Sequence, residues 1–229
     1  MSEAIGAISS MATRELLAEL AAAWRARTGE AVHVESVGGV DAARRLQAGE
    51  DFDVAVLASD AINRLAAAGA VLAGSKVDLV HSPVAVAVRA GDPVPDLGSE
   101  DALRRAVQAA ATIGYSTGPS GTALLRLFER WGLAAELQPR LVQAPPGVPV
   151  GALVANGEAA LGFQQLSELI HLEGIAVAGV LPPPVAIVTT FSGAVCAGSS
   201  RAEAARRLLA FMACPDADSA KRRQGMEPA

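Results

Sequence analysis

Short apolar runs alternate with longer segments of helical spacing along this chain, and this alternation restricts the possible folds more than any other feature. In the first 70 residues, strands are predicted over residues 5–8, 31–37 and 53–57. Helices are predicted to end at Gly29 and to cover residues 41–48 and 60–68, followed by Gly49 and Gly69. A repeated order of strand and helix is typical of a mostly parallel sheet that helices cover on both faces.

The rest of the chain continues this pattern. Strands are predicted over residues 84–88, 113–115, 161–163 and 186–191, and helices over residues 100–111, 150–155, 166–171 and 202–212, with one more from the turn at 116–121 to Trp131. A chain of 229 residues is long enough for one large domain or two small ones. The predicted fold class is therefore α/β, with mostly parallel sheets covered by helices.

Two proline-containing segments are the best candidates for places where the chain passes between domains. They are Val80-His81-Ser82-Pro83 and the triple proline at 182–184. Proline limits backbone freedom and cannot donate a hydrogen bond to a sheet. Two crossings imply a discontinuous first lobe over residues 1–80 plus 186–229, a second lobe over residues 83–182, and a hinge near 80–83 and 182–186.

The composition excludes several classes of protein. Hydrophobic residues make up 51% of the chain, which excludes a disordered protein because so much apolar surface would stay in contact with water. The net charge of −5 and the aromatic content of 3% exclude a basic nucleic-acid-binding protein. No apolar run reaches the roughly 18 residues that a membrane helix needs, so no membrane segment is expected.

The N-terminal sequence Met1-Ser2-Glu3-Ala4 lacks the charged and apolar regions of a secretion signal. We therefore expect a cytoplasmic protein, or a periplasmic one served by a transporter permease if a signal peptide has been removed. The two cysteines, Cys196 and Cys214, make neither a disulfide framework nor a metal site, and the three histidines lack metal-ligand spacing. No metal and no cofactor are expected.

Hydroxyl groups, glycines and amides gather in the segments that follow predicted strands. In open α/β sheets, ligands bind beyond the carboxyl ends of the strands, where helix starts offer free N–H groups to an anion. The candidate ligand-binding residues are Ser9, Ser10, Met11, Thr13, Gly38, Gly39, Val40, Ser59, Ser116, Thr117, Ser120, Gly121, Gln164 and Gln165. A plainer interpretation stays open, since serines also cap helices and paired glycines also make tight turns.

Two residues are candidates for proton transfer. Glu168 follows the amide side chains of Gln164 and Gln165, which can bind a carboxylate or orient a base. His81 is the second candidate. The plainer interpretations are a solvated helix residue for Glu168 and packing at the hinge for His81.

Several stretches, in this order, carry a resemblance to a known family. They are residues 9–13, Gln47-Ala48-Gly49 with residues 53–60, residues 152–163, and residues 189–194. Over nearly its whole length the chain resembles the molybdate-binding (ModA-like) branch of bacterial extracellular solute-binding proteins, and within it a leaderless sub-branch with the stretches 163–169 and 225–228. The resemblance implies a type II periplasmic-binding-protein fold, in which two lobes joined by a two-strand hinge close on a small anion in the cleft.

The resemblance also bears on the ligand. In that family, serines of the first two loops and a tyrosine of the second lobe hold the metal oxyanion. The matching positions here are Ser10 or Met11 and Gly39 or Val40, and the only tyrosine, Tyr115, lies in a different loop. The predicted ligand is therefore an organic carboxylate rather than molybdate.

Two further hypotheses about function stay open. An aconitate isomerase shares the fold of this family, which makes a cytoplasmic isomerase of an unsaturated di- or tricarboxylate the main alternative to a binding protein. Such an enzyme would use Glu168, or else His81, to move a proton between carbon atoms. A ligand sensor that reports to a separate partner is the third hypothesis.

Overall fold

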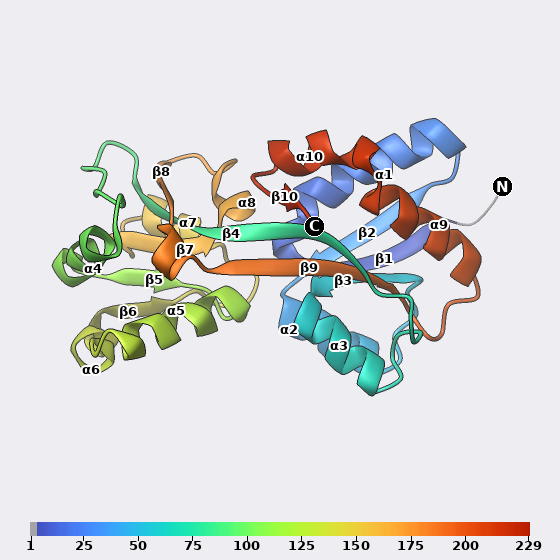
Figure 1. Cartoon of the computed structure of the whole chain (residues 1–229), viewed down its shortest axis with the longest axis horizontal. Coiled ribbons are helices and arrows are strands. Elements are labelled where there is room, and N and C mark those ends of the chain that lie inside the picture. The colour runs from blue at the N-terminus through green and yellow to red at the C-terminus, as the bar shows by residue number, and fades with distance from the viewer. Residues whose placement is uncertain (1–3) are drawn as a thin grey trace. The chain divides into compact units, whose positions relative to one another are not determined.

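The computed structural model describes residues 4–229, and its elements divide into two compact units (Figure 1). Unit 1 runs to His81 and resumes at Thr190, whereas unit 2 is Ser82–Thr189. Strands β4 (Val77–Arg89) and β9 (Val188–Val195) contain residues of both units. Residues 1–3, on which the argument about a secretion signal partly rests, lie outside the described residues.

The sheet of unit 1 is formed by the alternating segments at the start of the chain. Its strand order is β2-β1-β3-β9, in which β1 is parallel to both β2 and β3 and β9 is antiparallel to β3. The elements are β1 (Ile5–Ser10), α1 (Arg14–Thr28), β2 (Val32–Val37), α2 (Gly39–Gln47), β3 (Val54–Ala58), α3 (Ser59–Ala67), α9 (Ala202–Ala213), α10 (Asp218–Arg223) and β10 (Glu227–Pro228). The predicted parallel pairing of the first three strands is confirmed.

Helices bury both faces of this sheet. Val54 and Val56 of β3 join one apolar cluster with α1 and α9, whereas Ala55 and Leu57 join a second cluster with α2 and α3. All of β3 is buried, as expected for a strand in the centre of a covered sheet. Burying a side chain such as that of Leu57 contributes about 1.5–3 kcal/mol, so this core holds the strand ends in place.

Three glycines end the first three helices, as predicted. The φ angles of Gly29, Gly49 and Gly69 are 77°, 81° and 72°. These values lie in the left-handed region, where glycine is not strained because it has no Cβ atom. Each chain reversal returns the backbone to the next strand of the sheet.

Unit 2 has its own sheet and core. β5 is parallel to β6 and β7, and β4 is antiparallel to β7 and β8. The elements are α4 (Glu100–Ala109), β5 (Ile113–Tyr115), α5 (Pro119–Arg130), α6 (Ala134–Leu137), β6 (Leu141–Gln143), α7 (Val150–Ala155), β7 (Leu161–Gln165), α8 (Leu166–Leu169) and β8 (Ile175–Val180). The rings of Phe128 and Phe163 meet edge to face in the core, with centroids 6.3 Å apart.

Several predicted boundaries differ from the structure. The strand was predicted from residue 84, whereas β4 begins at Val77 and runs through Pro83, since a strand tolerates proline where no N–H bond is lost. The strand predicted over residues 186–191 begins later, at Val188, and runs to Val195. The role of these two segments as a hinge stays a prediction.

Candidate functional site

Most candidate residues of unit 1 lie at one edge of its sheet. β1, β2 and β3 are parallel, so their carboxyl ends meet at this edge. Ser9 and Ser10 are the last residues of β1, not part of a loop, and Met11–Thr13 form a short 3-10 turn after it. Gly38 precedes α2, Gly39 and Val40 begin it, and Ser59 begins α3. The structure therefore brings together this half of the predicted set.

Two of these hydroxyl groups are used inside the protein. Ser9 is fully buried, and its Oγ lies 2.8 Å from Oγ of Ser36, its neighbour across the β1–β2 pair. The Thr13 hydroxyl donates to the Ser10 carbonyl at 3.1 Å and is also buried. Ser9 and Thr13 therefore stabilise the end of β1, but neither side chain caps a helix.

The Ser10 hydroxyl is different. Its Oγ is buried and has no hydrogen-bond partner, although only 8% of the residue is exposed. A Cβ atom on Gly39 would lie 3.6 Å from the Cβ of Ser10, so the hydroxyl-bearing residue adjoins the start of α2. Burying an unpaired hydroxyl costs about 1–3 kcal/mol, which a bound acceptor would recover.

The start of α2 adds donors beside Ser10. No side chain caps this nine-residue helix, whose N-cap residue is Gly38. Backbone N–H groups in the first turn of a helix lack internal partners, and the helix dipole adds partial positive charge there. Val40, in that first turn, exposes 69% of its surface. Ser10 and the start of α2 are hereafter called the Ser10 cradle.

His81 lies in the part of β4 that belongs to unit 1. Its Nδ1 is 3.0 Å from the Thr190 Oγ1, and its backbone pairs with Glu227 of β10. Thr190 precedes Phe191, which pairs with Ala58 at the end of β3. His81 is therefore linked through β9 to the edge of the sheet that carries the Ser10 cradle.

A second group of candidates follows β5 in unit 2. The hydroxyls of Ser116 and Ser120 lie 3.0 Å apart, and Thr117 is exposed beside them. Ser120 and Gly121 belong to the first turn of α5, not to a loop, and no side chain caps this helix. One hydroxyl of a serine pair donates to the other, so one hydrogen of the pair remains for an anion.

Gly121 allows the first turn of α5 to approach the backbone of Ser116 closely. A Cβ atom at this position would lie 1.8 Å from the Ser116 carbonyl oxygen. Only a residue without a side chain allows the backbone to approach so closely. Gly121 is therefore expected to shape the turn that presents Ser116 and Ser120.

The two glutamines end the buried strand β7 and do not lie in a loop. Gln164 Oε1 accepts hydrogen bonds from the backbone N–H groups of Val150 (2.8 Å) and Gly151 (3.4 Å), and its Nε2 donates to Glu168 at 2.8 Å. Gln165 Nε2 donates to Thr189 at 2.8 Å, while its Oε1 is buried and has no partner. The two amides serve different neighbours because consecutive strand residues point to opposite faces.

Three residues whose hydroxyl groups bond to candidate side chains were not predicted. They are Ser36, Thr189 and Thr190. Ser36 lies near the end of the strand predicted over residues 31–37, and the two threonines lie in the stretch 189–194, so each was visible as a hydroxyl near a strand end. Their partners depend on strand pairing, which a single sequence does not give.

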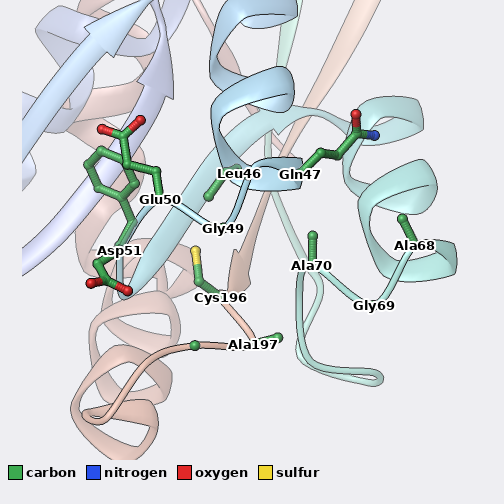
Figure 2. A pocket seen from close by; sticks show the side chains of 12 residues that line it. Leu46, Gln47, Gly49, Glu50, Asp51, Ala68, Gly69, Ala70, Cys196 and Ala197 are labelled. Carbon is green, nitrogen blue, oxygen red and sulfur yellow. The ribbon is translucent and has the colours of Figure 1, made fainter.

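A pocket of about 470 Å³ opens at the other end of the unit 1 sheet, where β3 begins (Figure 2). Its lining residues are Leu46, Gln47, Gly49, Glu50, Asp51, Phe52, Ala68, Gly69, Ala70, Cys196, Ala197 and Gly198. Burial raises the pKa of the Cys196 thiol to about 12, and a hydrogen bond from Arg45 lowers the pKa of Glu50. None of the predicted site residues lines this pocket.

The described residues offer no metal site and no membrane helix. Among residues 4–229, no three His, Cys, Asp or Glu side chains are grouped so that they could hold a metal ion. In the same residues no helix is both long and apolar enough to cross a membrane.

Comparisons with known proteins cover almost the whole chain. A family model described as bacterial extracellular solute-binding protein matches residues 5–227. An aconitate isomerase from a Pseudomonas species is 38% identical over 227 residues, which cover 96% of this chain and 86% of that protein.

Solved structures share the fold. The periplasmic molybdate-binding protein of Azotobacter vinelandii aligns with a TM-score of 0.82 and 21% identity, over 97% of this chain and 98% of that one. The sulfate-binding protein SubI of Mycobacterium tuberculosis H37Rv aligns with a TM-score of 0.81 and 18% identity, over 100% of this chain and 88% of that one.

Proposed function

This chain belongs to the family of bacterial extracellular solute-binding proteins and has their type II periplasmic-binding fold, and from this premise we propose that it binds a small organic polycarboxylate. The observation that carries the proposal is the Ser10 cradle. A buried hydroxyl without a partner adjoins an uncapped helix start. A carboxylate oxygen would accept from both kinds of donor and gain from the helix dipole.

The surroundings favour a carboxylate over an inorganic oxyanion. Val40 places an exposed apolar side chain in the first turn of α2, beside the Ser10 cradle. An inorganic oxyanion presents oxygen on every side, and each oxygen needs a donor when buried. An organic carboxylate has a carbon skeleton that can lie against Val40. The relative named aconitate isomerase supports the same class of ligand, because aconitate is a tricarboxylate.

A screen of anions tests this proposal. Unfolding temperatures are measured with molybdate, sulfate, and a set of di- and tricarboxylates that includes cis- and trans-aconitate. A ligand at a hundredfold excess over its Kd is expected to stabilise the protein by about 2.7 kcal/mol. Stabilisation by tricarboxylates supports the proposal. Stabilisation by molybdate or sulfate alone refutes it.

A second candidate function is isomerisation of an unsaturated tricarboxylate. Two observations favour it: the 38% identity to the aconitate isomerase, and the hydrogen bond that fixes Glu168 to Gln164. In this reaction the Glu168 carboxylate would take a proton from the methylene carbon next to the double bond. The electron pair of the broken C–H bond would spread over the allylic carbons and a carboxylate, where N–H donors stabilise it. The proton on Glu168 exchanges with solvent, and Glu168 would then give a proton to the former vinyl carbon, so the composition stays unchanged.

Proton spectra of cis-aconitate with the protein in D₂O test the second candidate. Wild-type protein is expected to form trans-aconitate and to introduce deuterium at the allylic carbon. Glu168→Gln should reduce the rate by about 100-fold or more, because general-base catalysis contributes roughly 10²–10⁴-fold. Glu173→Gln is the matched control, since it removes the same charge from an exposed residue of unit 2. Equal rates for wild type and Glu168→Gln would contradict the role of Glu168.

A further inference from the structure

Gln164 connects two short elements of unit 2 through a single buried side chain. It is 3% exposed and lies near the end of β7, on which both α7 and α8 pack. Its Oε1 accepts from Val150 and Gly151 at the start of α7, and its Nε2 donates to Oε1 of Glu168 in α8. One amide therefore links the beginning of one helix to the carboxylate of another.

The two ends of this amide are not interchangeable. The N–H groups of α7 can only donate, so they require the amide oxygen on their side. The amide nitrogen must then face Glu168, and it can only donate. The Glu168 oxygen in this contact is consequently an acceptor. The backbone of α7 thus determines which way the Gln164 amide points, and the amide determines where the Glu168 oxygen lies.

The first N–H groups of α7 need a hydrogen-bond acceptor from another element. Its N-cap residue is Pro149, which has no side-chain oxygen to accept from the helix. Without an acceptor, the first N–H groups of the helix would be left unpaired, and Val150 is itself buried. Gln164 supplies the missing acceptor from β7. These internal hydrogen bonds give the buried glutamine a structural role.

We propose that Gln164 is a positioning residue, which holds the Glu168 carboxylate in one orientation by anchoring it to the start of α7. The inference rests on the isomerase proposal, in which Glu168 is the base. It also replaces the expectation from the sequence that the Gln164 amide binds the ligand directly. A base must lie within hydrogen-bond reach of the proton it removes, and a displacement of about 1 Å can cost roughly 100-fold in rate.

The Gln164→Glu substitution keeps the hydrogen bonds to the start of α7 and removes the one to Glu168. A carboxylate at this position still accepts from Val150 and Gly151, so the cap of α7 is kept. It offers no N–H to Glu168 and repels that carboxylate. Gln108→Glu is the matched control, because it makes the same change on the exposed surface of α4.

The expected result is a change in kcat. With cis-aconitate as substrate, kcat of Gln164→Glu should fall about 100-fold while KM stays within about threefold. Gln108→Glu should match the wild type in both constants. A wild-type kcat in Gln164→Glu would overturn the inference.

A spectroscopic measurement covers the case in which Gln164→Glu does not fold. The side-chain NH₂ signal of Gln164 is recorded in the wild type, in Glu168→Gln and in Glu173→Gln. It should move upfield in Glu168→Gln only, because a neutral amide accepts more weakly than a carboxylate. If the wild type isomerises cis-aconitate but the NH₂ signal of Gln164 does not move in Glu168→Gln, the inference about Gln164 is refuted and the isomerase proposal is not. Absence of isomerisation by the wild type refutes the isomerase proposal, and the catalytic role of Gln164 with it.

Discussion

Ser10→Ala should stabilise the ligand-free protein and weaken its binding of a carboxylate, two effects of opposite sign. The Ser10 Oγ is buried without a partner, which costs about 1–3 kcal/mol. Alanine removes this cost but leaves a small gap, so the free energy of unfolding should rise by about 1 kcal/mol. For a chain of this size, that corresponds to roughly 2–4 °C in unfolding temperature. A hydrogen bond to a charged ligand contributes about 1.5–3 kcal/mol, so the Kd should rise by about 10–150-fold.

Calorimetric titration with cis-aconitate and denaturant unfolding without ligand measure the two effects. Ser9→Ala is the matched comparison, because it removes the neighbouring hydroxyl, which is bonded to Ser36 at 2.8 Å. That variant should lose about 1 kcal/mol of stability, since it breaks an existing hydrogen bond. If Ser10→Ala is less stable than the wild type and binds the ligand equally well, the Ser10 hydroxyl is structural and the cradle is refuted.

Two further predictions concern packing and pH. Gly121→Ala should destabilise the protein by about 3 kcal/mol in denaturant unfolding, because the added Cβ would lie 1.8 Å from the Ser116 carbonyl oxygen. Gly118→Ala should cost less than about 1 kcal/mol, because its Cβ would have no contact closer than 3.9 Å. Equal losses of stability in the two variants would contradict this packing. Burial raises the pKa of the Cys196 thiol from its ordinary value of 9.0 to about 12 in the folded protein. Above about pH 9 the thiol therefore loses its proton on unfolding. The free energy of unfolding should fall there by up to about 1.4 kcal/mol per pH unit. This slope should be reduced in Cys196→Ala and kept in Cys214→Ala, and a slope unchanged by Cys196→Ala would contradict the shift.

Much of the fold could be predicted because its signals are local. The apolar run of β3 and the glycines after α1, α2 and α3 determine strand and helix ends within a few neighbouring residues. The strands β4 and β9, which contain residues of both units, are harder to predict. A strand was predicted to start after Pro83, yet β4 begins at Val77 and continues through Pro83, because pairing with strands far along the chain decides the outcome. β6 and β8 were not predicted for the same reason.

The site could be predicted as a set of positions but not as a set of roles. The ends of predicted strands indicated Ser9 and Ser10 in unit 1 and Gln164 in unit 2, since parallel strands bring their carboxyl ends to one edge of their own sheet. Only pairing across the sheet shows that Ser9 is bonded to Ser36 whereas Ser10 has no partner. Similarly, the role of Gln164 follows from the uncapped start of α7, which the sequence does not place beside it.

Parallel calorimetric titrations with cis-aconitate and molybdate distinguish a polycarboxylate-binding protein from an oxyanion-binding one. We expect saturable binding of cis-aconitate at least tenfold tighter than any binding of molybdate, and weaker binding of cis-aconitate by Ser10→Ala. Saturable binding of molybdate with no heat from cis-aconitate would contradict this expectation.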